Sequence, residues 1–193
     1  MLKKLKLSNV GPAAAMELEF GQRLNLITGD NGLGKSFLLD IAWWAITGNW
    51  PAEANPALTS GRQALPKVPT TGAYLGFTLM SDTLGHIHQG SFVRTEQSWQ
   101  RSIQKADKGL VFYVMPDGSF AVWDAARNAL PMQQHTGHGM PSAYVFSPKQ
   151  VWDGLQRNDG TWLCNGLIRD WASWQKEKGP TFKRRRIQEL SAT

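Results

Sequence analysis

The chain has 193 residues, of which 41% are hydrophobic, so it is long enough to bury a core and has the composition of a globular protein. No apolar run is long enough to cross a bilayer, and the single cysteine, Cys164, excludes an intramolecular disulfide and indicates a small buried side chain without chemistry. We therefore expect a cytoplasmic protein with no membrane partner.

Alternating side chains predict two strands at the start of the chain, over residues 2–10 and 16–20. Gly11-Pro12 separates them and Gly21 ends the second strand. Residues 23–28, Arg-Leu-Asn-Leu-Ile-Thr, are apolar enough for a third, buried strand. These three predicted strands lead directly into the main motif of the chain.

Residues 29–36 read Gly-Asp-Asn-Gly-Leu-Gly-Lys-Ser and hold every fixed position of a phosphate-binding loop. In such a loop, backbone N–H groups surround the phosphates, the lysine reaches the outer phosphates and the serine hydroxyl binds Mg²⁺. The motif therefore predicts a nucleoside triphosphate bound with Mg²⁺. The predicted contacts are Gly29, Asp30, Asn31, Gly32, Leu33, Gly34, Lys35, Ser36 and Phe37.

The rest of the chain alternates predicted helices and strands. A helix over residues 36–47 ends at Gly48, and a Pro-rich surface excursion follows over residues 49–71. Strands are predicted over residues 73–80, 86–95, 109–115, 119–123 and 142–146, the first four forming an antiparallel sheet. A helix is predicted over residues 161–178, with an apolar stripe that is either core or a face left for a partner: Leu163, Leu167, Trp171 and Trp174.

The first 48 residues resemble the N-terminal half of the ATPase head in the SMC, Rad50 and RecF group of ABC-type ATPases, often labelled AAA-family ATPases. The resemblance rests on Leu-Lys-Leu-Ser-Asn-Val-Gly-Pro at 5–12, the strand at 16–20, and the run at 24–36 that contains the phosphate-binding loop. It implies an α/β fold, with residues 1–193 as a single lobe that has a mixed sheet and an antiparallel portion. ATP and Mg²⁺ are the implied cofactors.

The resemblance also implies roles for single residues. Asn9, in the turn after the first strand, would lie near the base and ribose. Gln150 matches the glutamine that reaches Mg²⁺ and the attacking water, so it joins Ser36 at the metal and Lys35 as a catalytic residue. The alternative for Gln150 is an ordinary surface glutamine at the start of a helix.

An ATPase of this type also needs an acidic residue at the end of a second buried strand, with a glutamate beside it. Asp82, Asp117 and Asp124 have no adjacent glutamate, and no Leu-Ser-Gly-Gly-like signature is present. In the resembling family these parts lie in the C-terminal half of the head. We therefore expect a lobe completed by a C-terminal half, on a longer chain or another polypeptide, or by a second head, with little or no activity alone.

Other patterns leave alternatives open. The basic tail, residues 176–193, carries six Lys or Arg and two Glu residues and either contacts DNA phosphates or is solvated. The His86/His88 and His135/His138 pairs are more simply incidental than metal ligands. The resembling family implies DNA repair or defence against phage, with DNA or an effector protein as partner. The alternative is a non-catalytic nucleotide-binding module, and a small P-loop kinase or GTPase is disfavoured.

Overall fold

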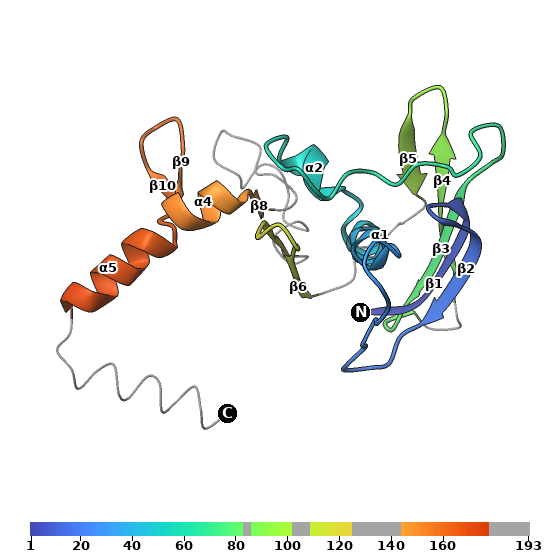
Figure 1. The fold of residues 1–193 in the computed structure, drawn as a ribbon, viewed down its shortest axis with the longest axis horizontal. Coiled ribbons are helices and arrows are strands. Elements are labelled where there is room, and N and C mark those ends of the chain that lie inside the picture. Colours follow the sequence, from blue (N-terminus) through green and yellow to red (C-terminus); the bar gives the residue numbers. More distant parts are fainter. Residues whose placement is uncertain (83–85, 102–108, 125–143, 178–193) are drawn as a thin grey trace. The chain divides into compact units, whose positions relative to one another are not determined.

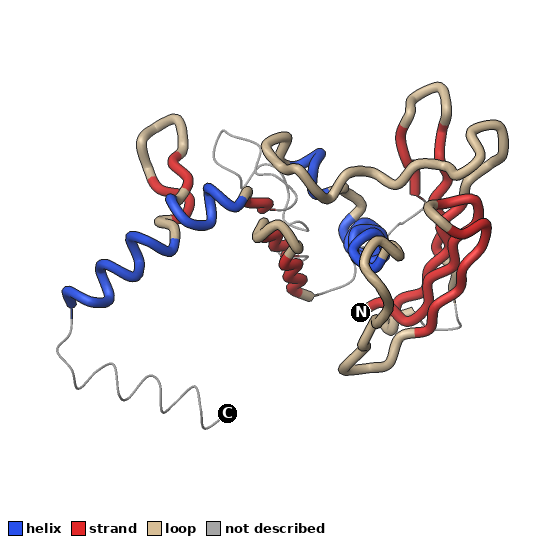
Figure 2. Tube along the Cα trace, in the orientation of Figure 1, coloured by secondary structure: helices blue, strands red, loops and turns tan. Residues whose placement is uncertain are grey.

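The computed structural model describes residues 1–82, 86–101, 109–124 and 144–177. Its internal contacts divide the chain into two compact units, Met1–Val145 and Phe146–Thr193. Both units combine helices and strands, so the α/β class holds (Figures 1 and 2). The single lobe predicted for residues 1–193 stays a prediction. None of the helices in the described part could span a membrane.

The first unit contains a five-stranded antiparallel sheet. Its strands are β1 (Leu2–Val10), β2 (Ala13–Glu19), β3 (Tyr74–Leu79), β4 (His88–Val93) and β5 (Ser98–Arg101), in the order β2-β1-β3-β4-β5. Leu5 lies opposite Leu18 on one side and Phe77 on the other, so apolar residues share one face of the sheet. Four of these strands confirm predictions, whereas β5 was not predicted. The single antiparallel sheet predicted for the strands at 73–80, 86–95, 109–115 and 119–123 is wrong, because the last two strands belong to a different sheet.

The helix after the phosphate-binding loop, α1 (Lys35–Thr47), packs on the apolar face of this sheet. It ends as predicted at Gly48, whose φ of 84° is left-handed. Trp44 lies at the centre of the contact, with its ring stacked on Trp50 at 5.6 Å and edge-on to Trp99 at 5.7 Å. The side chain of Trp44 is so close to β4 that Gly90 has no room for a Cβ atom.

A second apolar cluster covers another side of α1. It includes the three-stranded sheet β6 (Leu110–Val114), β7 (Phe120–Asp124) and β8 (Tyr144–Phe146), of which β6 and β7 are antiparallel. Trp43 is buried there, with its ring 6.0 Å from Tyr113. The short helix α2 (Pro51–Ala54) also contributes to this cluster and lies inside the segment predicted as an irregular excursion. Consecutive tryptophans of α1 therefore belong to two different cores.

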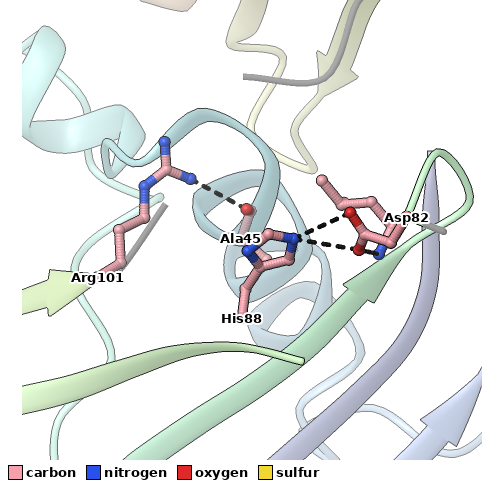
Figure 3. A network of polar contacts seen from close by, with 5 residues as sticks. Ala45, Asp82, His88 and Arg101 are labelled. Atoms are coloured by element: carbon pink, nitrogen blue, oxygen red, sulfur yellow. Dashed lines mark hydrogen bonds and ion pairs between the residues drawn. The ribbon is translucent and has the colours of Figure 1, made fainter. Parts of the chain in front are cut away.

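Polar side chains fasten β4 and β5 to their surroundings (Figure 3). Arg101 on β5 donates hydrogen bonds to the carbonyl oxygens of Trp44 and Ala45, at 3.3 and 3.0 Å, and so caps the C-terminal end of α1. Burial lowers the pKa of Arg101 to about 10. His88 on β4 contacts both carboxylate oxygens of Asp82 at 3.1 Å. Both carboxylate oxygens of Asp82 therefore have a partner within the fold.

The second unit consists of α4 (Pro148–Asp153), a hairpin of β9 (Leu155–Gln156) and β10 (Trp162–Cys164), and α5 (Leu167–Glu177). The helix predicted over residues 161–178 is wrong in its first turns, because Gly166 has a left-handed φ of 79° and separates the hairpin from the helix. The predicted core stripe is also wrong as a core. Leu167, Trp171 and Trp174 are 47%, 63% and 53% exposed, which agrees with the open-face alternative.

Candidate nucleotide-binding site

The three glycines of the motif adopt backbone conformations that other residues rarely adopt. Gly29, Gly32 and Gly34 have φ values of 147°, 84° and 83°, all in the region that favours glycine. Gly34 is the N-cap of α1, and no side chain caps this helix. The first-turn N–H groups of α1 therefore face the loop, where they favour an anion.

Lys35 lies across this loop. Its ammonium group donates hydrogen bonds to the carbonyl oxygens of Gly29 and Asp30, both at 2.6 Å. The next residue, Ser36, is exposed. A charged ammonium and an exposed hydroxyl thus lie at the start of α1, as binding of a magnesium nucleotide requires.

The turn between β1 and β2 packs against the loop. The ring of Pro12 is 3.4 Å from the position that a Cβ atom on Gly34 would take, and Gly11 lies directly on the ring of Phe37. Gly11 has a φ of 71° and no space for a side chain. This turn therefore forms one wall of the candidate site.

Asn9 supports the turn between β1 and β2 through hydrogen bonds to the backbone of residues 68–72. Its Nδ2 group donates to the carbonyl oxygens of Val68, Thr71 and Gly72 at 3.0, 2.9 and 3.3 Å, while its Oδ1 accepts from the N–H of Val68 at 2.8 Å. Asn9 is buried and has a left-handed φ of 56°. Its amide is occupied by the backbone of residues 68–72, so its predicted contact with the nucleotide stays a prediction.

Lys67 is a residue of this region that the sequence did not single out. Its ammonium group donates to the carbonyl oxygen of Pro12 at 2.9 Å, and its N–H donates to the carbonyl oxygen of Asn9 at 3.1 Å. Among the described residues, none of the ion pairs involves Lys67. A second cation, with no carboxylate partner in the described part of the chain, therefore lies beside the turn that contacts Gly34. Only the folded chain brings these residues together, since 55 positions separate Lys67 from Pro12.

The buried strand predicted over residues 23–28 is wrong. The segment pairs with no strand of the described residues, and Leu24 and Leu26 are 87% and 83% exposed. Ile27 alone packs against the core of α1 and the five-stranded sheet. The backbone of a strand needs a neighbouring strand for its hydrogen bonds. An apolar sequence pattern does not supply that neighbour, and no described strand pairs with residues 23–28.

Gln150 lies in the second unit, in the first turn of α4. Its Oε1 accepts a hydrogen bond from the N–H of Ser147 at 2.8 Å, while the Ser147 hydroxyl accepts from the N–H of Gln150 at 3.4 Å. This is a capping box, which agrees with the alternative of a helix-entry glutamine. The role of Gln150 at Mg²⁺ stays a prediction.

The histidine pairs supply no metal centre in the described part of the chain. No group of three His, Cys, Asp or Glu residues there could hold a metal ion. The ring centroids of His86 and His88 are 4.8 Å apart. His135 and His138 lie outside the described residues. The residues at the loop still fit Mg²⁺, which binds through few protein ligands, phosphates and several waters.

Asp40 is a half-buried carboxylate one helical turn after Ser36. Its Oδ1 accepts a hydrogen bond from the Tyr113 hydroxyl at 2.7 Å. Burial raises the pKa of Asp40 and the charge of Asp117 raises it further, whereas the bond from Tyr113 lowers it. Burial also raises the pKa of Tyr113, so the tyrosine stays a donor at neutral pH.

This raised pKa predicts a pH dependence of stability. The folded chain holds the Asp40 proton more tightly than the unfolded chain does. The contribution of Asp40 to the free energy of unfolding is therefore present in acid and lost as pH rises through the raised pKa. Urea unfolding across this range should show the wild-type chain losing stability relative to Asp40→Asn. Asp159→Asn is the control with opposite sign, because Thr161 lowers the pKa of Asp159. A wild-type chain that gains stability relative to Asp40→Asn as pH rises would contradict the assignment.

A comparison with known families identifies the domain. A protein-family model described as an AAA domain matches residues 4–107, which is more than half of the chain, so the chain belongs to this family. The match contains the phosphate-binding loop, α1, most of β1 and strands β2 to β5. The family makes this a nucleotide-binding, ATPase-type domain. No curated protein matches the chain.

Proposed function

We propose that this chain is the ATP-binding lobe of an SMC/RecF-like ATPase and binds Mg-ATP through residues 29–36. The observation that carries the proposal is the uncapped N-terminus of α1, with the Lys35 ammonium across the loop and the Ser36 hydroxyl exposed. Phosphates would replace the carbonyl oxygens as partners of Lys35. Lys67 supplies a second positive charge beside the turn at Pro12.

Hydrolysis, in this proposal, requires a complementary C-terminal half. Leu24 and Leu26 expose an apolar edge directly before the loop, which a strand of the complementary half would cover. Two aspartates already have partners within the fold: Asp82 contacts His88, and Asp117 accepts hydrogen bonds from the hydroxyls of Ser60 and Thr59. Neither is left to polarise an attacking water.

The proposed biological setting is DNA repair or defence against phage. The six basic residues of the tail suit DNA phosphates, and a second head or an effector protein would be the protein partner. The exposed apolar side of α5 favours the alternative of a non-catalytic module that binds a partner, since Ile168 and Trp171 are 55% and 63% exposed.

Calorimetric titration of ATP with Mg²⁺ tests the nucleotide site. Lys35→Ala should weaken binding at least about tenfold, because it removes a charged hydrogen-bonding group from the phosphates. Lys6→Ala is the matched control: it removes the same charge from an exposed β1 residue and should leave affinity unchanged.

A phosphate-release assay on the same samples tests the need for a complement. Release close to background from a chain that binds ATP supports the proposed lobe. Turnover that is rapid and lost in Lys35→Ala would contradict it, because the chain would then contain its own catalytic acid. ATP binding that Lys35→Ala leaves intact would overturn the site itself.

A further inference from the structure

Asp40 is the carboxylate nearest to the candidate magnesium ligand along the helix. It follows Ser36 by four residues within α1, so both side chains lie on one face with Cβ atoms about 5–6 Å apart. The Cα–Cβ bonds of a helix tilt toward its N-terminus, so that of Asp40 tilts toward the turn that carries Ser36. This spacing suits a single intervening water molecule.

The hydrogen bonding of Asp40 leaves one oxygen available. Among the described residues, Oδ1 is the atom that accepts the bond from Tyr113, and Oδ2 accepts none. Oδ2 is also not one of the fully buried polar atoms that lack a partner, so solvent reaches it. The bond to Tyr113 holds the carboxylate in one orientation, as an outer ligand of a metal requires.

We propose that Asp40 binds the Mg²⁺ of the nucleotide through a water molecule, beside the Ser36 hydroxyl. Magnesium dehydrates reluctantly and keeps several waters, whose hydrogen bonds a nearby carboxylate accepts. Asp40 thus contributes to metal binding within this lobe, and the acid that polarises the attacking water still belongs to the complement. The inference rests on the proposed nucleotide site.

Mn²⁺ titration of the protein with a non-hydrolysable ATP analogue, followed by electron paramagnetic resonance, tests this role. Asp40→Asn should lower the Mn²⁺ affinity of the complex about tenfold, because the amide is uncharged and a weaker acceptor for metal-bound water. It should leave binding of a fluorescent ATP analogue in EDTA unchanged. The variant should fold, since an amide oxygen can still accept the bond from Tyr113.

Two control variants separate metal binding from other effects. Asp117→Asn removes a nearby charge that also acts on Asp40, and it should change Mn²⁺ affinity less than about twofold. Tyr113→Phe removes the hydrogen bond but keeps the carboxylate, and it should change Mn²⁺ affinity less than Asp40→Asn. Unchanged Mn²⁺ affinity in Asp40→Asn, or an equal loss in Asp117→Asn, would overturn the inference.

The EDTA measurement keeps the two proposals distinct. If the wild-type protein binds the analogue in EDTA and the Lys35→Ala variant does not, the nucleotide site is supported whatever the Mn²⁺ result is. Failure of the wild-type protein to bind nucleotide with or without metal would overturn the proposed function, and the role of Asp40 with it.

Discussion

Trp44→Ala is expected to lower the free energy of unfolding by about 3–5 kcal/mol. Trp44 is 1% exposed and contacts the rings of Trp50 and Trp99. Its ring also packs so closely on Gly90 that a Cβ atom there would clash with it. Alanine would leave a cavity between α1 and the sheet that these aromatic rings and the glycine backbone cannot fill. Urea unfolding followed by far-UV circular dichroism measures the loss.

Trp171→Ala is the matched control, because it makes the same chemical change at a side chain that is 63% exposed. It should change stability by no more than about 0.5 kcal/mol. A cost below about 1 kcal/mol at Trp44 would show that the contact between α1 and the five-stranded sheet is looser than the burial of this ring indicates.

Asn9→Ala should lower the free energy of unfolding by about 2–3 kcal/mol, because it leaves backbone groups of residues 68–72 without their partner. Limited proteolysis should then cleave within residues 65–72 faster than it does in the wild-type chain. ATP affinity should also fall, because the turn that packs on Gly34 loses its support.

Comparison with Asn9→Gly separates hydrogen bonding from backbone strain. Both variants lose the same hydrogen bonds, but glycine adopts the φ of 56° without strain, so Asn9→Gly should be the more stable of the two by about 1 kcal/mol. Ser8→Ala, at an exposed neighbour in β1, should be neutral. Equal stability of Asn9→Ala and Ser8→Ala would contradict the role of the Asn9 side chain.

The elements with strong local patterns were predictable. Alternation identified β1 and β2, and the helical spacing of apolar residues together with Gly48 predicted α1 and its end. The pattern failed at residues 23–28, because an apolar run specifies burial but not the neighbour that provides hydrogen bonds. It failed again at residues 161–166, where the left-handed Gly166 interrupts an otherwise helical pattern.

The candidate site was predictable only where it is contiguous in the chain. The contacts within residues 29–36 could be predicted from the octapeptide, because the loop and the start of α1 follow each other directly in the chain. Lys67 and the support that Asn9 gives to the turn depend on contacts between positions more than fifty residues apart. Asp40 is close in sequence, but its burial and its bond from Tyr113 arise from β6.

The position of Trp43 beside Trp44 bears on how the chain can be divided. Trp44 packs inside the region that matches the AAA domain, whereas Trp43 packs on Tyr113, Met115 and Trp123, which lie beyond residue 107. A fragment cut at the end of the family match would expose one side of the helix that carries Lys35. The region that matches the family is therefore shorter than the region that folds together. A fragment expressed to study the nucleotide site must extend at least to Val145.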